Sequence, residues 1–441
     1  MAVRAGAARL VTTPPLDVQR GLEGRRLLPP SEGVHDDLHT RALVLESAGR
    51  TLAIVSCDAI GIPSGAFTTR VRRLVGEATG IAPEGILLAA THAHSTPWTL
   101  HLLDAEIDGH WLETWAHQVA SAVALAHRRL APAQAFFWRE ELPLAENRRV
   151  PCSDGRVYRN WRRPKPAPPV RQHPMDPELG LLWVEHPDGR PLAVLSNYAM
   201  HPVTVMTVPY YSADFPGVAT RLVERVYGES FVALFTNGAA GDVNPPNVRD
   251  RWQDAEQTGI ALGGAILRGC GLAQLRLHRQ GEEALPREGV ALAAVARAIH
   301  PPFREIPAEL LPAAANDAGG AARRNPVLLA ARLARLAEED EPLELQALRI
   351  GELALVGVPG ELFCAIGLRI KERSPVPHTL IAGYANNWLS YFPTPIAFDE
   401  GDYEVMVAPW SRYTAAAGEQ IEQTALELLR ACWSEPTSPG A

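Results

Sequence analysis

Two histidines, His92 and His94, follow the apolar run ILLAA in the stretch LLAATHAHSTP (residues 87–97). In an extended backbone, residues i and i+2 project to the same side of the chain, about 7 Å apart. Two imidazoles placed in this way suit two ligands of one metal ion, or one ligand beside an acid/base group. A pair of hydrogen-bonded histidines at a strand end has the same spacing, so the motif alone leaves both interpretations open.

Three further side chains with metal-binding or acid/base chemistry also follow apolar runs. His201 follows LAVLSNYAM, Glu361 follows LALVGVPG, and Tyr391 comes shortly after TLIAGY. Two or three histidines and a carboxylate form a ligand set that zinc accepts in catalytic sites, where one position stays open for water. Two of these residues also have a simpler explanation. His201 precedes a proline and could pack under a turn, and Glu361 could be a first-turn carboxylate that interacts with a helix dipole.

A repeated unit positions these residues. A short apolar run stops abruptly at a polar, loop-forming segment. The runs are TLAIVSC (51–57), GILLAA (85–90), LAVLSNYAM (192–200), VALFTN (232–237), LALVGV (353–358) and TLIAGY (379–384). Continuous apolar runs of this length are typical of strands buried on both faces.

Helical patterns separate the apolar runs, and the clearest cover residues 113–130, 216–226 and 411–433. Alternating strands and helices predict an α/β protein with a mixed, buried β-sheet core covered by helices. We expect one domain over residues 1–441, with a helical insertion or lid at 281–345, where the composition shifts to Ala, Glu and Arg. Ligands of such folds bind beyond the carboxyl ends of the strands, where the candidate residues stand.

Composition narrows the functional classes. The net charge of −8 offers no basic surface for nucleic acid. The chain contains no run of 18 apolar residues, so we expect no transmembrane segment, and its first residues lack the apolar core of a signal peptide. Five cysteines without paired spacing indicate reduced thiols, hence a cytoplasmic location. Nothing in the sequence specifies the oligomeric state.

Five motifs together resemble the catalytic domain of the neutral/alkaline non-lysosomal ceramidases. They are THAHSTP, HPVTV, GDVNP, PGE and YFPTPIAFDEGDYE, and the likeness runs from about residue 5 to 430. The resemblance implies a zinc ion with four protein ligands, namely His92, His201, Glu361 and Tyr391. It also implies that His94 lies beside the metal rather than on it, that Tyr403 is a catalytic tyrosine, and that Arg148 contacts substrate.

The sequence departs from the ceramidase pattern at Asn244, which stands where the family has a serine in the GDV-S-P loop. An amide can bind substrate but cannot form a useful covalent intermediate, so we expect direct attack by metal-bound water. The family's C-terminal β-sandwich and secretory signal are also missing from the sequence, so the expected match is to the catalytic domain only.

The resulting prediction is a zinc-dependent hydrolase that cleaves the amide bond of a small-molecule N-acyl substrate. Tyr403 would stabilise the oxyanion and His94 would carry the proton to the leaving amine. Asp58 and Asp242 could orient the histidines by hydrogen bonds, or could simply cap loops. The alternatives are a zinc-dependent esterase or small-molecule amidase that does not act on sphingolipid, and a catalytically silent, ligand-binding member of the fold.

Overall fold

Six apolar runs of the sequence form three pairs of parallel strands in the computed structural model. The structure describes residues 3–18, 22–23, 26–27, 31–100, 102, 107–161, 165–280, 290–310, 326–339 and 341–434. The strands are β6 (Arg50–Cys57), β7 (Ile86–Ala90), β14 (Pro191–Tyr198), β16 (Val232–Asn237), β20 (Leu353–Gly357) and β22 (His378–Ala382). The parallel pairs are β6 with β7, β14 with β16, and β20 with β22.

The carboxyl ends of the three pairs meet. The backbone N–H of Gly383, after β22, donates to the carbonyl of Asn237 at the end of β16 (3.0 Å). The N–H of Ala90, at the end of β7, donates to the carbonyl of Tyr384 (3.1 Å). The loops that follow these strands therefore share one region of the molecule, as the candidate site requires.

Each parallel pair belongs to a different sheet, extended by antiparallel strands. The first sheet has the order β7-β6-β5-β1-β8, with β5 (His39–Ser47), β1 (Arg4–Val11) and β8 (Ala131–Pro132). The second has the order β16-β14-β13-β9, with β13 (Glu178–Glu185) and β9 (Gln134–Glu141). The third has the order β18-β19-β20-β22, with β18 (Leu292–Ile299) and β19 (Leu343–Ile350).

The inner faces of the three sheets form one hydrophobic cluster. Leu43 and Leu45 come from the first sheet, Leu195 from the second, and Leu355 and Leu380 from the third, and all are at most 2% exposed. Helices cover the outer faces, so most strands are buried on both sides, which explains the continuous apolar runs. The predicted mixed, helix-covered sheet core is confirmed, and its strands are divided among three sheets.

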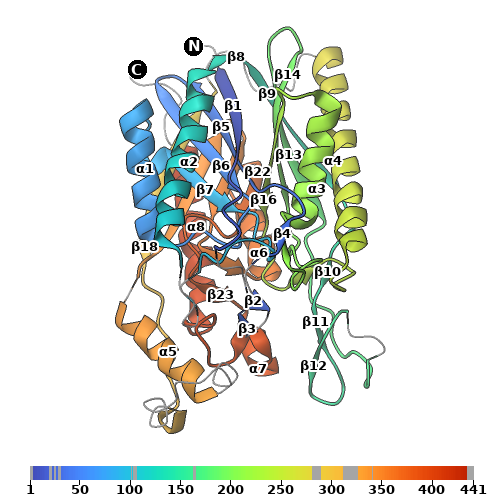
Figure 1. Cartoon of the computed structure of the whole chain (residues 1–441), viewed down its shortest axis with the longest axis vertical. Coiled ribbons are helices and arrows are strands. Elements are labelled where there is room, and N and C mark those ends of the chain that lie inside the picture. Colours follow the sequence, from blue (N-terminus) through green and yellow to red (C-terminus); the bar gives the residue numbers. More distant parts are fainter. Residues whose placement is uncertain are drawn as a thin grey trace.

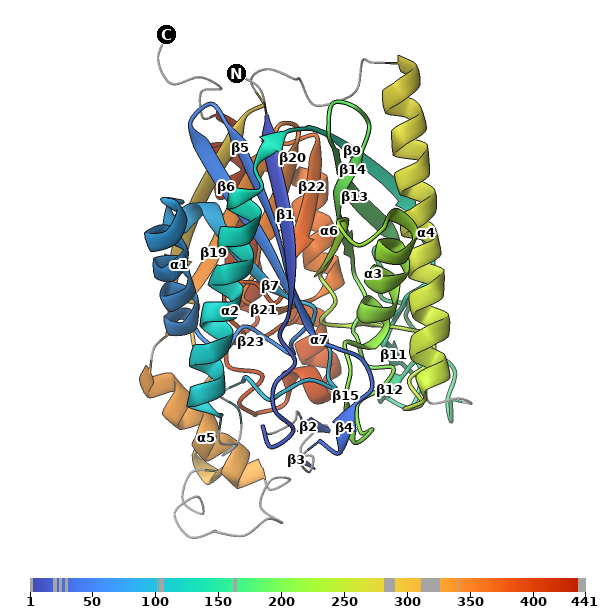
Figure 2. The same cartoon turned by 45° about the horizontal axis from the view of Figure 1, so that its top comes forward.

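Helices flank the sheets on several sides (Figure 1, Figure 2). Helix α2 (Gly109–Arg128) packs on the first sheet and on α1 (Gly65–Thr79). Helices α3 (Asp214–Tyr227) and α4 (Trp252–Gln280) pack on the second sheet, and α6 (Cys364–Arg373) and α8 (Ala416–Ser434) on the third. Two more are α5 (Pro326–Glu339) and α7 (Pro395–Glu400). The predictions at 113–130, 216–226 and 411–433 are confirmed as α2, α3 and α8.

Short two-stranded ribbons shape the loops that lie below the sheets in the view of Figure 1. They pair β10 (Glu146–Asn147) with β17 (Val243–Asn244), β11 (Arg149–Pro151) with β12 (Val157–Arg159), and β21 (Gly360–Leu362) with β23 (Ser390–Phe392). Two others pair β15 (Tyr210–Tyr211) with β4 (Gly33–Val34), and β2 (Leu22–Glu23) with β3 (Arg26–Leu27).

The prediction of a helical segment at 281–345 needs correction. Residues 326–339 form helix α5, but residues 292–299 form β18, which pairs along its whole length with β19 of the third sheet. Residues 281–289 and 311–325 lie outside the described residues. The sequence ALAAVARAI favours a helix by intrinsic propensity, whereas pairing with a neighbouring strand overrides that weak preference.

By length and composition, α4 is the one helix among the described residues that could cross a membrane. The helix packs on α3, β9 and β13, and 39% of its apolar window is buried inside the protein. Leu262, Ile266 and Cys270 face this interior contact. A core-covering helix has the same composition, so its length and hydropathy are weak evidence for a membrane span.

Candidate metal centre

His92 lies in the loop after β7, not on the strand itself. Its backbone is left-handed (φ 69°), an uncommon conformation for a residue other than glycine. Its Nδ1 lies 2.5 Å from the carbonyl oxygen of Ile60. A carbonyl only accepts, so Nδ1 carries the proton and Nε2 presents a lone pair. The left-handed backbone replaces the extended geometry that the H-x-H spacing predicts.

His201 follows β14 and is held in a similar way. Its Nδ1 donates to the carbonyl of Ala240 (3.2 Å), and its backbone N–H donates to the carbonyl of Val243 (2.9 Å). His94 lies opposite, with its backbone N–H donating to the carbonyl of Pro202 (3.3 Å). The Nδ1 of His94 is buried and has no hydrogen-bond partner in the described part of the chain.

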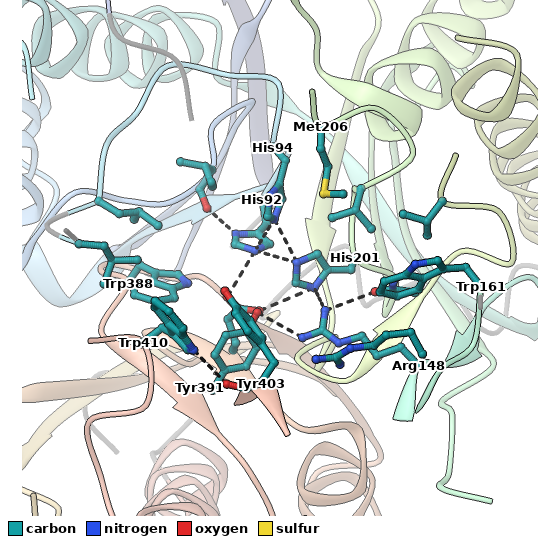
Figure 3. Close-up of a pocket in the computed structure, with 18 of the residues that line it drawn as sticks. His92, His94, Arg148, Trp161, His201, Met206, Trp388, Tyr391, Tyr403 and Trp410 are labelled. Carbon is teal, nitrogen blue, oxygen red and sulfur yellow. Dashed lines mark hydrogen bonds and ion pairs between the residues drawn. The ribbon is translucent and has the colours of Figure 1, made fainter. Parts of the chain in front are cut away.

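The Nε2 atoms of the three histidines converge (Figure 3). The distances are 3.1 Å between His92 and His201, 3.1 Å between His94 and His201, and 3.3 Å between His92 and His94. Two lone pairs cannot hydrogen-bond to each other, so the contact of His92 with His201 needs a cation to be favourable. A tetrahedral zinc ion about 2.0–2.1 Å from each nitrogen would hold such atoms about 3.3 Å apart.

The three imidazoles therefore fit a metal ion. The Nε2 of His94 is 3.1 Å from that of His201 and 3.3 Å from that of His92, close to the 3.1 Å between His92 and His201. Distance alone therefore does not separate a ligand from a neighbouring acid/base group. Burial lowers the pKa of His92 and His201 well below the ordinary value, and lowers the pKa of His94 to about 3. All three rings are thus neutral near pH 7, the form in which imidazole binds metals.

Glu361 approaches the same point from β21. Its Oε1 is 3.5 Å from Nε2 of His92, and its Oε2 is buried with no hydrogen-bond partner in the described ranges. Burial raises the pKa of Glu361 to about 8, opposed by the charge of Arg148 and a hydrogen bond from Tyr391. A buried carboxylate oxygen without a partner is costly unless a cation neutralises it. The Oε2 of Glu361 is therefore a second feature that fits a bound metal ion.

The remaining predicted residues surround this cluster. Arg148, from the loop between β10 and β11, donates from Nη2 to the hydroxyl of Tyr391 (3.2 Å) and from Nη1 to Oδ1 of Asn244 (3.4 Å). The rings of Tyr391 and Tyr403 meet edge to face, with centroids 5.9 Å apart. Burial raises the pKa of both phenols above the ordinary value, so each keeps its proton at neutral pH in the metal-free chain.

All eight predicted site residues line one cavity of about 330 Å³. They are His92, His94, Arg148, His201, Asn244, Glu361, Tyr391 and Tyr403. Most of the other lining side chains are apolar or aromatic, including Ile60, Leu100, Val203, Met206 and four tryptophans, Trp98, Trp161, Trp388 and Trp410. The tryptophans carry no spacing signal, so sequence reasoning missed them.

Asp58 and Asp242 make no hydrogen bond to His92, His94 or His201, so of the two roles suggested for them the orienting role is wrong. Asp58 accepts from Arg41 and from the backbone of His39. Asp242 accepts from Asn147 and from the backbone of Cys364. Both carboxylates hold loops in place, and the carbonyls of Ile60 and Ala240 orient the imidazoles of His92 and His201.

Glu404 is a site residue that sequence reasoning missed. Its side chain is fully buried and contacts three arginines: Arg148 (2.8 Å), Arg149 (2.6 Å) and Arg159. Burial opposes ionisation, but the three guanidiniums outweigh it and hold the pKa of Glu404 well below the ordinary value. The residue follows Tyr403 in the turn Tyr403–Val405, so it ties that phenol and Arg148 to one charged cluster.

Glu404→Gln is expected to destabilise the protein by about 3–5 kcal/mol, the usual cost of breaking a buried ion pair. The free energy of unfolding can be compared with that of Glu224→Gln, since Glu224 is a buried partner of Arg9 and Arg41 outside the cavity. Both changes should destabilise the fold, and only Glu404→Gln should lower kcat/KM in conditions where the protein is folded. Equal kcat/KM for the two variants would limit Glu404 to a structural role.

The fold and the cluster define a class: an α/β protein with a buried candidate metal centre at the carboxyl ends of its parallel strands. The profile of the family described as "Neutral/alkaline non-lysosomal ceramidase, N-terminal" matches residues 27–261. The chain belongs to this neutral/alkaline ceramidase family.

Two relatives carry the family's name, and two solved structures share the fold. The neutral ceramidase of Pseudomonas aeruginosa is 24% identical over 88% of this chain and 66% of its own length. That of Mycobacterium tuberculosis is 24% identical over 90% of this chain and 72% of its own. A structure titled "Ceramidase complexed with C2" superposes with a TM-score of 0.77 and 20% identity, covering all of this chain and 77% of the other. The crystal structure of the neutral ceramidase from Pseudomonas aeruginosa superposes with a TM-score of 0.76 and 21% identity, covering all of this chain and 76% of the other.

Proposed function

We propose that this chain is a zinc-dependent hydrolase that cleaves the amide bond of an N-acyl compound. The observation that carries the proposal is the convergence of the three imidazole Nε2 atoms, 3.1–3.3 Å apart, in a buried cavity beside Glu361. Membership of the ceramidase family supports amide hydrolysis as the reaction.

Zinc is the metal we propose because imidazole nitrogens and a carboxylate are ligands that suit it. The ligands would be His92, His201, Glu361 and Tyr391, with His94 beside them. Zinc bound here would polarise the acyl carbonyl and lower the pKa of a coordinated water toward 7. The protein's part is to align the substrate and to place proton donors and acceptors around it.

Three side chains supply these groups. Tyr403 keeps its proton and can donate a hydrogen bond to the oxygen that becomes negative in the transition state. His94, a neutral ring with one lone pair toward the cluster, can accept the proton that the attacking water loses and then pass it to the leaving amine. Arg148, fixed between Glu404 and Tyr391, orients the Tyr391 hydroxyl and adds positive charge beside the carboxylate of Glu361.

The apolar lining supports a lipid-like acyl group as the part of the substrate that fills the cavity. Ceramide is one such N-acyl compound. A second candidate is hydrolysis of an ester or of a small non-sphingolipid amide, which Asn244 favours. Its Oδ1 accepts from Arg148, and its Nδ2 makes no hydrogen bond to any described residue, so the cavity wall offers an amide donor there.

A panel of N-acyl amides and matched esters, short-chain and long-chain ceramide included, tests this proposal. Chelator-treated protein should be inactive, and added Zn²⁺ should restore hydrolysis of at least one amide. Because Asn244 replaces a hydroxyl, we expect weak turnover of long-chain ceramide. A zinc-loaded, folded protein that binds N-acyl compounds and hydrolyses none of them would instead identify a silent, ligand-binding member of the fold.

A further inference from the structure

Tyr384 is a fully buried tyrosine in the loop after β22. It ends the apolar run TLIAGY but belongs neither to the five ceramidase-like motifs nor to the cavity lining. Its backbone is left-handed (φ 57°), as is that of His92. A non-glycine residue in this conformation is strained and persists only when its surroundings fix it. Its hydroxyl is buried and has no hydrogen-bond partner among the described residues. Hydrogen bonding by the hydroxyl therefore does not explain why a tyrosine occupies this position.

The backbone of Tyr384 connects two strand ends that carry candidate ligands. Its carbonyl accepts from the N–H of Ala90, two residues before His92 (3.1 Å). Its N–H donates to the carbonyl of Gly360, immediately before Glu361 (3.2 Å). The residue before it, Gly383, has no room for a side chain, since an added Cβ would lie 2.7 Å from the carbonyl oxygen of Gly238. The position of Tyr384 is therefore tightly determined.

The ring of Tyr384 lies flat against the imidazole of His92. The ring centroids are 4.0 Å apart and the planes differ by only 16°. The hydrogen bond from Nδ1 of His92 to Ile60 fixes the tautomer and one direction in the imidazole plane. It leaves the ring free to tilt about that bond, and a flat neighbour at stacking distance removes this freedom.

We propose that Tyr384 is a positioning residue of the metal centre, which holds the imidazole plane of His92 so that its Nε2 points at the other two histidines. The aromatic face performs this role and the hydroxyl is dispensable. The inference rests on the proposed metal site. Groups that orient a ligand from outside the coordination sphere typically change metal affinity by about 10–100-fold.

The test measures the Zn²⁺ affinity of the full chain by competition with a chromophoric chelator, together with the Tm of the metal-free protein. Tyr384→Phe keeps the ring and should keep the wild-type affinity. Tyr384→Asn removes the ring but tolerates a left-handed backbone, and it should weaken Zn²⁺ binding about 10–100-fold. Tyr384→Leu is a second variant without the ring, and whichever of the two retains the wild-type circular dichroism spectrum is decisive.

Phe231→Leu is the matched control. Phe231 is fully buried against Trp183 and Tyr227, next to the amino end of β16 and away from the cavity. This variant should lower the Tm and leave Zn²⁺ affinity unchanged. Wild-type affinity in the folded ring-free variant, or loss of folding in both ring-free variants, would overturn the inference and make Tyr384 purely structural. Wild-type protein that binds no Zn²⁺ would instead refute the proposed metal centre.

Discussion

His92→Ala and His201→Ala should each abolish stoichiometric metal binding and, with it, hydrolysis. Each change removes one of the two proposed histidine ligands, whose Nε2 atoms lie 3.1 Å apart, and the remaining ligands cannot close the same site. Elemental analysis of the purified variants, with an assay on the best substrate, measures both effects. His378→Ala is the control, because this histidine packs on Phe137 at the amino end of β22.

His94→Ala separates the two roles open to that residue. If His94 is the proton carrier beside the metal, the variant should keep the metal and lose rate. If the metal is lost from His94→Ala and retained by His92→Ala, the two residues have exchanged roles. The structure makes this experiment necessary, since it places the Nε2 atoms of His92 and His94 at the same distance, 3.1 Å, from that of His201.

Tyr403→Phe should reduce kcat by about 10²–10³, the range for loss of one oxyanion donor. Metal content and folding should persist, because the ring and its stacking on Trp410, with centroids 5.0 Å apart, are kept. Steady-state kinetics on metal-replete protein gives the result. Tyr210→Phe, at an exposed tyrosine, is the control and should have wild-type kcat. Unchanged kcat and KM in Tyr403→Phe would assign Tyr403 to packing alone.

Much of the fold that serves the site could be predicted from the sequence. The six apolar runs correspond to the six parallel strands, because burial on both faces removes the polar alternation of an ordinary strand. The division into three sheets could not be predicted, since the runs look alike and pairing depends on distant contacts. Strand β18 was missed for a related reason: its alanine-rich sequence favours a helix until β19 pairs with it.

The candidate site also has parts that the sequence predicts and parts that it does not. His92, His201 and Glu361 stand at strand ends, where sequence order and the general position of ligands in α/β folds point to them. The orientation of the rings depends on left-handed backbones at His92 and Tyr384 and on carbonyls of Ile60 and Ala240, which no motif encodes. Glu404 was missed because its arginine partners are distant in sequence: Arg149 and Arg159 come from the β11–β12 hairpin and Arg148 directly precedes it. A single acidic residue in a loop has no pattern.

Metal content is the most direct test of the central claim. Purified wild-type protein, analysed by elemental mass spectrometry after dialysis against metal-free buffer, should contain one zinc ion per chain. The expectation follows from three neutral imidazoles and a carboxylate gathered in one buried cavity. Protein that is folded, yet contains no stoichiometric transition metal and binds none when Zn²⁺ is supplied, would contradict the account.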